Sequence, residues 1–181
     1  MTSDRTILIT GVTGHQGGAV ARALQGTGFS LRGLTRKPEG ERAAALARRG
    51  VEVVKGDLDD EATLRRALAG VWGVFSVQNS WEAGVEREEA QGKRLATLAR
   101  EGGVAHYVYT SVGSANQRTG VPHFDNKGRI EETVRGLRFP SHVILRPGIL
   151  HGEPNCTLQS PRLDAGLGAR ARHEATDDCG G

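Results

Sequence analysis

Three glycines near the N-terminus stand at a spacing that suits phosphate binding. Gly11, Gly14 and Gly17 follow a short apolar run, and a helical pattern begins directly after them. This order lets the chain turn sharply, approach a pyrophosphate with its backbone and pack helix closely on strand. The pyrophosphate would lie at the helix N-terminus, where free N–H groups and the helix dipole favour negative charge. An ordinary glycine-rich connection is the alternative to a dinucleotide-binding turn, whose polar lining would be Thr10, Thr13 and Gln16.

The end of the second apolar run bears on which dinucleotide would bind. An acidic residue about 20 positions beyond such a glycine turn bonds the ribose 2′-hydroxyl of NAD. Here the run ends in Thr35-Arg36-Lys37, and the next acidic residue is Glu39. A guanidinium group matches a 2′-phosphate, which an aspartate would repel. Arg36 therefore predicts NADP(H) in preference to NAD(H), with a solvated basic loop as the alternative.

Strand and helix patterns alternate along the part of the chain that must position these residues. Apolar runs predict strands at 6–10, 30–35, 51–55, 71–77, 104–110 and 142–145. Amphipathic stretches predict helices at 15–25, 41–49, 60–68, 82–101 and 125–134. This rhythm predicts the α/β class, a doubly wound parallel sheet (Rossmann fold) with strand order 3-2-1-4-5-6.

The alternation stops near His151. Residues 152–181 mix Gly, Pro, Arg and Asp with no sustained period, which predicts an irregular C-terminal tail. We therefore expect an NAD(P)-binding domain over residues 1–151, followed by the tail at 152–181, with the substrate-side lobe missing. Loss of the original reading frame or domain after His151 is a sharper explanation of the same pattern.

Composition narrows the class of protein. The chain has 181 residues, of which 37% are hydrophobic and 25% charged, with a net charge of +3. No apolar run approaches the roughly 20 residues that span a bilayer, and residues 1–4 lack the character of a signal peptide. We therefore expect a cytoplasmic protein with no membrane partner.

Two further partner classes find no support in the sequence. The basic residues are scattered among acidic ones, so no direct contact with nucleic acid is expected. The cysteines, Cys156 and Cys179, match no metal-site spacing, and no metal is expected. Without an export signal they are also poor evidence for a disulfide.

Several motifs follow the glycine turn in a fixed order. They are Leu34 to Pro38, Gly50 to Asp60, Gln91-Gly92-Lys93, Tyr107 to Ser111, Pro122 to Lys127 and Leu145-Arg146-Pro147. Together they resemble the NmrA-like family, an atypical branch of the short-chain dehydrogenase/reductases. The resemblance covers Thr6 to about Pro147 and is closest to the NADPH-sensor type, through Trp81-Glu82 and the stretch 123–127.

The resemblance implies further cofactor contacts. Asp57 and Leu58 leave the third strand and would flank the adenine, although Asp57 also suits the start of the next turn. Asn79 follows the fourth strand and would line the nicotinamide side of the cleft. A loop asparagine with no such role is the equal alternative for Asn79.

The catalytic pattern of the wider group is incomplete here. Ordinary short-chain dehydrogenases use Tyr-x-x-x-Lys, in which the lysine lowers the tyrosine pKa and holds the nicotinamide ribose. The same spacing here is His123 to Lys127. By resemblance Lys127 is a ribose ligand, or else an exposed lysine at a helix start. His123 is a candidate proton donor or a structural residue, and Ser111 a candidate substrate-polarising hydroxyl or a local backbone cap.

Three functions are consistent with this pattern. The missing tyrosine, which Tyr107 and Tyr109 in the fifth strand cannot replace, favours an NADP(H)-binding redox sensor or regulator. Such a regulator would act through a protein partner or a homodimer. Lys127 and His123 support the alternative, an NADPH-dependent oxidoreductase acting on quinones or related carbonyl compounds. A truncated remnant that binds cofactor poorly is the third, and the sequence leaves open whether the chain is an enzyme.

Overall fold

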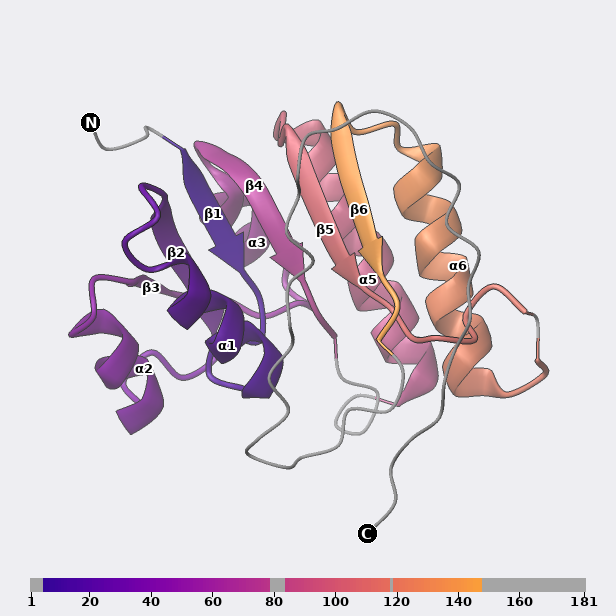
Figure 1. Cartoon of the computed structure of the whole chain (residues 1–181), viewed down its shortest axis with the longest axis horizontal. Helices are drawn as coiled ribbons and strands as arrows, with labels where there is room; N and C mark the ends of the chain where they lie inside the picture. The colour runs from indigo at the N-terminus through magenta and orange to yellow at the C-terminus, as the bar shows by residue number, and fades with distance from the viewer. Residues whose placement is uncertain (1–4, 79–83, 118, 148–181) are drawn as a thin grey trace, which may run out of the picture. The chain divides into compact units, whose positions relative to one another are not determined.

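Strands and helices alternate from Thr6 to Leu145 in a computed structural model that describes residues 5–78, 84–117 and 119–147 (Figure 1). The strands are β1 (Thr6–Ile9), β2 (Ser30–Thr35), β3 (Glu52–Lys55), β4 (Val71–Ser76), β5 (His106–Thr110) and β6 (Ser141–Leu145). All neighbouring strands pair in parallel, in the order β3-β2-β1-β4-β5-β6. The predicted doubly wound Rossmann sheet is confirmed.

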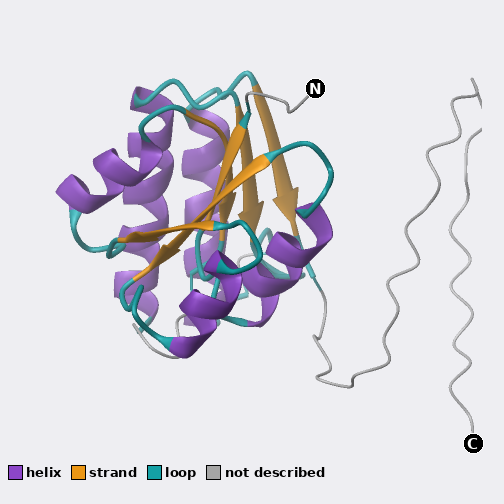
Figure 2. Ribbon diagram, turned by 90° about the vertical axis from the view of Figure 1, so that its left-hand side faces the viewer, coloured by secondary structure: helices purple, strands orange, loops and turns teal. Residues whose placement is uncertain are grey.

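Helices lie against both faces of this sheet (Figure 2). They are α1 (His15–Leu24), α2 (Glu41–Ala47), α3 (Glu61–Leu68), α5 (Val85–Glu101) and α6 (Pro122–Gly136). One core joins α3, α5 and α6 to the sheet and includes Leu64, Leu95 and Ile130. The other core joins α1 and α2 to the opposite face and includes Ala21 and Leu46.

The two faces are covered to different extents. Val108 of β5 packs with the core under α1 and α2, and its register partner on β6 is Val143. Register partners point to the same face, so Val143 lies on that side of the sheet. Val143 is 40% exposed and Leu145 is 44% exposed. Within the described residues, α1 and α2 therefore leave the β6 end of this face open, as Figure 1 shows.

Local signals fix several element ends. Asp60 caps α3, because its side chain accepts a hydrogen bond from the Thr63 backbone N–H at 3.2 Å. Helix α6 begins at Pro122, three residues before the expected 125, because a proline suits the first turn of a helix. His123 therefore lies inside α6 rather than before it.

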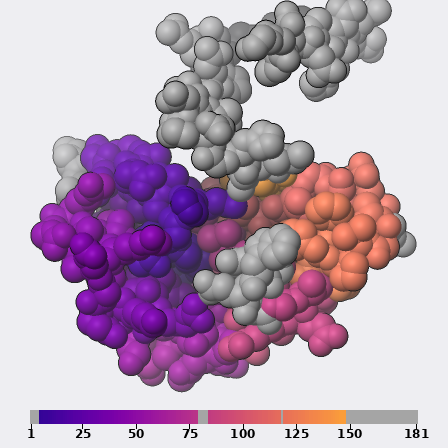
Figure 3. All heavy atoms as spheres, turned by 90° about the horizontal axis from the view of Figure 1, so that it is seen from below, coloured from indigo at the N-terminus to yellow at the C-terminus, as the bar shows by residue number. Residues whose placement is uncertain are grey.

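Because all strands are parallel, their carboxyl ends meet at one edge of the sheet. Open α/β sheets bind ligands at this edge. Figure 3 views the molecule from this edge and shows indigo atoms of the N-terminal segment together with magenta and orange atoms of later segments. Asn79, Trp81-Glu82 and the tail at 152–181 lie outside the described residues. None of the described helices is long and apolar enough to cross a membrane.

Candidate dinucleotide-binding site

The glycine turn connects β1 to α1 with a tightly folded backbone. Gly11 has a φ of +59°, a conformation that side chains rarely adopt, and its carbonyl accepts the Gly14 N–H at 2.9 Å. A Cβ on Gly17 would lie 2.4 Å from the Gly11 carbonyl oxygen, which is backbone and cannot move aside. Gly14 is the N-cap residue of α1 and offers no side chain to its first turn. The first N–H groups of α1 are thus left for another acceptor.

The polar side chains expected to line the turn differ in their surroundings. Thr10 is 1% exposed, and its hydroxyl accepts the Val77 N–H at 2.8 Å. It also donates to the Val77 carbonyl at 3.0 Å, so this hydroxyl links β1 to the chain beyond β4. Thr13 and Gln16 are half-buried, and the Thr13 carbonyl accepts a bond from Arg42 of α2 at 3.3 Å.

Arg36 follows β2 directly and is exposed. Since β2 pairs with β1, this position adjoins the end of β1, from which the glycine turn departs. The backbone there is fixed by Thr35, whose hydroxyl accepts the Lys37 N–H at 3.2 Å. The position is the one at which a doubly wound domain reads the 2′ substituent of the adenosine ribose.

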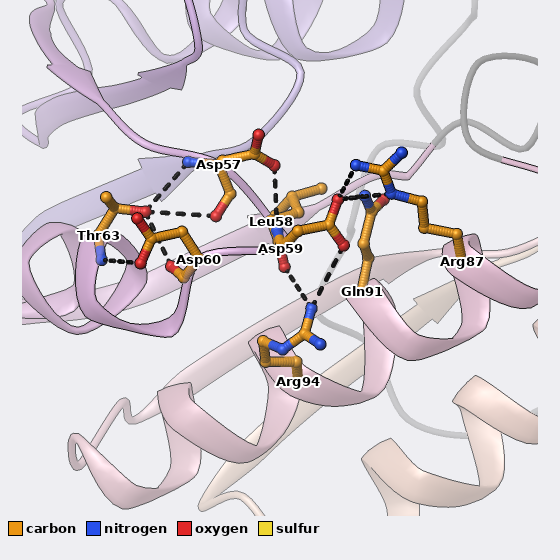
Figure 4. A network of polar contacts seen from close by, with 8 residues as sticks. All are labelled: Asp57, Leu58, Asp59, Asp60, Thr63, Arg87, Gln91 and Arg94. Carbon is orange, nitrogen blue, oxygen red and sulfur yellow. Dashed lines mark hydrogen bonds and ion pairs between the residues drawn. The ribbon is translucent and has the colours of Figure 1, made fainter.

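The loop that leaves β3 is held by hydrogen bonds on two sides (Figure 4). Asp57 donates its N–H to the Thr63 hydroxyl at 3.1 Å, and its carboxylate accepts the Asp59 N–H at 3.0 Å. The Leu58 carbonyl accepts from Arg94 of α5 at 2.8 Å. The pair expected beside the adenine is therefore fixed both to α3 and to α5.

Asp59 connects this loop most strongly to α5, as Figure 4 shows. Its carboxylate accepts from the Arg87 Nε at 2.6 Å and from the Gln91 Nε2 at 2.9 Å. Arg94 lies at 3.5 Å from the other carboxylate oxygen. Burial would raise the pKa of Asp59, but the hydrogen bonds from Arg87 and Gln91 hold this pKa below its ordinary value.

Lys127 occupies a buried position on α6. It is 6% exposed, and its Nζ lies 2.7 Å from the Oε1 of Glu88, a residue of α5 that is fully buried. The other Glu88 oxygen accepts from Asn126 at 2.9 Å. The interpretation of Lys127 as an exposed lysine at a helix start is therefore wrong, because α6 packs against α5 at this point.

The two tyrosines of β5 are buried, and Tyr109 lies close to this ion pair. Tyr107 and Tyr109 are fully buried, and the Lys127 Nζ lies 5.8 Å from the Tyr109 ring centre. Burial, with the charge of Glu88 as the next contribution, raises the pKa of Tyr109 above its ordinary value. That neither tyrosine replaces the missing one stays a prediction.

Ser111 lies at the exit of β5, in a tightly bonded region. It is 4% exposed, and its N–H donates to the Leu145 carbonyl at 2.7 Å. Its Oγ is buried and has no hydrogen-bond partner among the described residues, so the structure shows no backbone cap by this hydroxyl. Nearby, burial would raise the pKa of Glu131 of α6, but the hydrogen bonds from Arg146 and Arg135 lower it to about 2. The polarising role of Ser111 stays a prediction.

His123 stands one turn before Lys127 on α6, so the two side chains share one side of the helix. It is half-buried, and its ring centre lies 5.6 Å from that of Phe124. The structure leaves its role as a proton donor a prediction. Across the described residues, the carboxyl edge of the sheet brings together the glycine turn, Arg36 and the Asp57-Leu58 loop.

Sequence reasoning assigned no role to Asp59, Glu88 or Glu131. Each carries a buried or partly buried carboxylate that joins two segments distant in sequence. One signal was present for the two on helices: both stand among apolar residues at helical spacing, on the buried side of α5 and α6. A charged residue in such a stripe indicates a buried partner.

The fold and the glycine turn define a dinucleotide-binding domain of the Rossmann class. The sequence model of the NmrA-like family matches residues 3–151, and the chain belongs to this family. A curated relative from Aspergillus versicolor, the NmrA-like family domain-containing oxidoreductase notA', is 37% identical over 141 residues. The alignment covers 72% of this chain and 40% of that relative.

Solved structures give the same comparison in three dimensions. The triphenylmethane reductase of Citrobacter sp., crystallised with NADP(H), matches with a TM-score of 0.69 and 28% identity, over 78% of this chain and 48% of that one. The negative transcriptional regulator NmrA, crystallised with NADP, matches with a TM-score of 0.67 and 28% identity, over 77% and 44%. The matched part of the chain thus covers less than half the length of each of these relatives.

The residues of this chain fit a dinucleotide. Backbone atoms of the turn lie so close to Gly17 that only a glycine fits there, and this close contact holds the start of α1 against the end of β1. No side chain caps the N-terminus of α1. These features suit a pyrophosphate. Gly14 and Gly17 would hold it, Arg36 would meet the adenosine ribose, and Lys127 would meet the nicotinamide ribose.

Proposed function

We propose that the chain is an NADP(H)-binding domain that acts as a redox sensor or regulator. The observation that carries the proposal is the glycine turn. Its backbone packs so closely at Gly17 that no side chain fits, and the first N–H groups of α1 have no side-chain cap and can bind an anion. The NADP(H) complexes of structural neighbours support a nicotinamide dinucleotide as ligand. Because the match covers only 40% of this relative's length, the NmrA-like oxidoreductase notA', partners and substrates of a whole protein belong to this proposal as well.

The preference for NADP(H) over NAD(H) rests on Arg36. A guanidinium fork at the end of β2 can pair with a 2′-phosphate, and no acidic residue stands there to bind a 2′-hydroxyl. NmrA has also been crystallised with NAD, so family membership alone does not decide between the two. The preference is therefore a property to be measured on this chain.

A bound NADPH would supply a hydride, and the described residues give it little acid–base support. The tyrosine of the dehydrogenase pattern is replaced by His123, and both tyrosines of β5 are buried with raised pKa values. The positive charge of Lys127 is compensated by Glu88, so it is poorly placed to lower the pKa of a neighbouring acid. This arrangement supports the proposal of binding without efficient turnover.

The second candidate function is an NADPH-dependent oxidoreductase acting on quinones or related carbonyl compounds. Lys127 and His123 on one side of α6 favour it, and an NADPH-dependent quinone oxidoreductase of Escherichia coli is among the structural neighbours. Steady-state oxidation of NADPH, measured with a panel of quinones, separates the two functions. We expect no saturable rate; a saturable rate that His123→Ala abolishes, in a protein that still binds NADPH, would establish the reductase instead.

A further inference from the structure

Glu88 is a buried carboxylate whose partners both lie on α6. It is fully buried, and Lys127 and Asn126 bond its two oxygens at 2.7 and 2.9 Å. Asn126 also donates to the Val85 carbonyl at 3.0 Å, which fixes the amide that orients the carboxylate. A buried carboxylate without such partners would lower the stability of the fold, so these two hydrogen bonds hold the Glu88 side chain in one orientation.

We propose that Glu88 is a positioning residue for dinucleotide binding, which holds the Lys127 ammonium group where it meets the nicotinamide ribose. The inference rests on the proposed function, in which Lys127 is a ribose ligand. A lysine side chain has four flexible bonds, and its ammonium group has three N–H donors. The Glu88 carboxylate accepts one donor and restrains the chain, while the remaining donors can serve ribose hydroxyls.

The same helix is anchored at the adenine end. Gln91 lies three residues after Glu88, on the same side of α5, and bonds Asp59 in the loop after β3. Arg94 bonds the carbonyl of Leu58 in that loop (Figure 4). One helix therefore sets the position of Lys127 relative to the loop expected beside the adenine. A dinucleotide that spans the site would meet both ends at a fixed separation.

The adjacent residue provides a matched control. Glu89 also joins α5 to α6, through Arg129 at 2.6 Å, and pairs with Lys93 at 2.6 Å. Its side chain is 18% exposed and both its partners are at least 40% exposed. Surface pairs of this kind contribute little and do not fix a buried donor. Glu89→Gln thus removes an equivalent charge from the same helix without touching Lys127.

The test compares two probes that share the adenine end. NADPH has the nicotinamide ribose, and adenosine 2′,5′-bisphosphate lacks it. Affinities of both are measured by calorimetry for the unaltered chain, Glu88→Gln, Glu88→Asp and Glu89→Gln. We expect Glu88→Gln to weaken NADPH about tenfold or more and to leave the bisphosphate within about twofold. Glu88→Asp keeps the charge but withdraws the carboxylate, so it should show the same selective loss, and Glu89→Gln should change neither.

A merely structural Glu88 would weaken both probes by the same factor, or neither, and either result overturns the proposal. Failure of the unaltered chain to bind the bisphosphate or NADPH would instead overturn the proposed function.

A second experiment, labelling of the unaltered chain with acetic anhydride, needs no variant. We expect Lys127 to react at least about tenfold more slowly than Lys93 without cofactor, because Lys127 is buried and its ammonium group is paired with Glu88. Comparable rates would show that the pair does not form in solution.

Discussion

The two halves of the sheet are prepared for a dinucleotide in different ways. The phosphate half comprises β1 to β3 with α1 and α2. It would bind the ligand with backbone N–H groups, at a turn that packs too closely at Gly17 for a side chain and at a helix start without a side-chain cap. The lysine half, comprising β4 to β6 with α5 and α6, offers side chains buried in ion pairs, with Glu88 and Lys127 at the centre. The site of the phosphate half therefore depends on glycines that lack a side chain, and the site of the lysine half depends on contacts between buried side chains.

This difference predicts where each half is fragile. In the phosphate half a single added carbon atom meets immovable backbone. In the lysine half, a substitution that removes one partner of the buried ion pair leaves the other charge buried and uncompensated. The loss of stability then exceeds the net stabilisation that the pair contributes. Substitutions should therefore separate the halves by both the size and the kind of their effects.

The largest effect is expected from Lys127→Met. The change leaves the fully buried Glu88 without its cation, and we expect the free energy of unfolding to fall by about 3–5 kcal/mol. Lys93→Met, which removes a 40% exposed partner of Glu89, should cost at most about 1 kcal/mol. Urea denaturation measures both, and equal small losses would mean that the lysine half does not depend on its buried pair.

A smaller loss of stability is expected from Gly17→Ala. The new Cβ would lie 2.4 Å from the Gly11 carbonyl oxygen, so strand and helix must separate, at a cost of about 1–3 kcal/mol. NADPH binding should be lost, because the turn no longer holds the helix start in place. Gly136→Ala, where a Cβ meets nothing within 4 Å, is the matched control and should be neutral or slightly stabilising, because Ala favours the helix more than Gly does. Retained NADPH affinity in Gly17→Ala would contradict a role for this turn.

A pH-dependent effect is expected from Glu131 in the lysine half. Burial opposes ionisation of Glu131, but the hydrogen bonds from Arg146 and Arg135 lower its pKa from 4.5 to about 2. A pKa that is lower in the folded than in the unfolded state stabilises the fold above pH 4.5, and this contribution is lost as the pH falls toward 2. Glu131→Gln should cost up to about 3 kcal/mol at neutral pH, the free energy that corresponds to this lowering of the pKa, and it should flatten the decline of stability below pH 4.5. An unchanged acid profile would contradict the assignment.

The phosphate half could be predicted from sequence because its determinants are local. The strand order and the position of the glycine turn follow from neighbouring residues and their spacing. The start of α6 was predicted too late, because Pro122 was not taken as a first-turn residue. Glu88 and Asp59 were missed for a different reason: each depends on contacts across more than 30 residues of sequence. The buried stripe of α5 showed that Glu88 needed a partner, but only the packing of α5 on α6 identifies it.

The most direct test of the central claim is a thermal-shift titration of the chain with NADPH and NADH, repeated on Arg36→Ala. A ligand that binds only the folded state adds about 2.7 kcal/mol of stability at a hundredfold excess over its dissociation constant. We predict stabilisation by NADPH that exceeds that by NADH, and loss of this difference in Arg36→Ala. Absence of stabilisation by either nucleotide in the unaltered chain would contradict the proposal that this domain binds a dinucleotide.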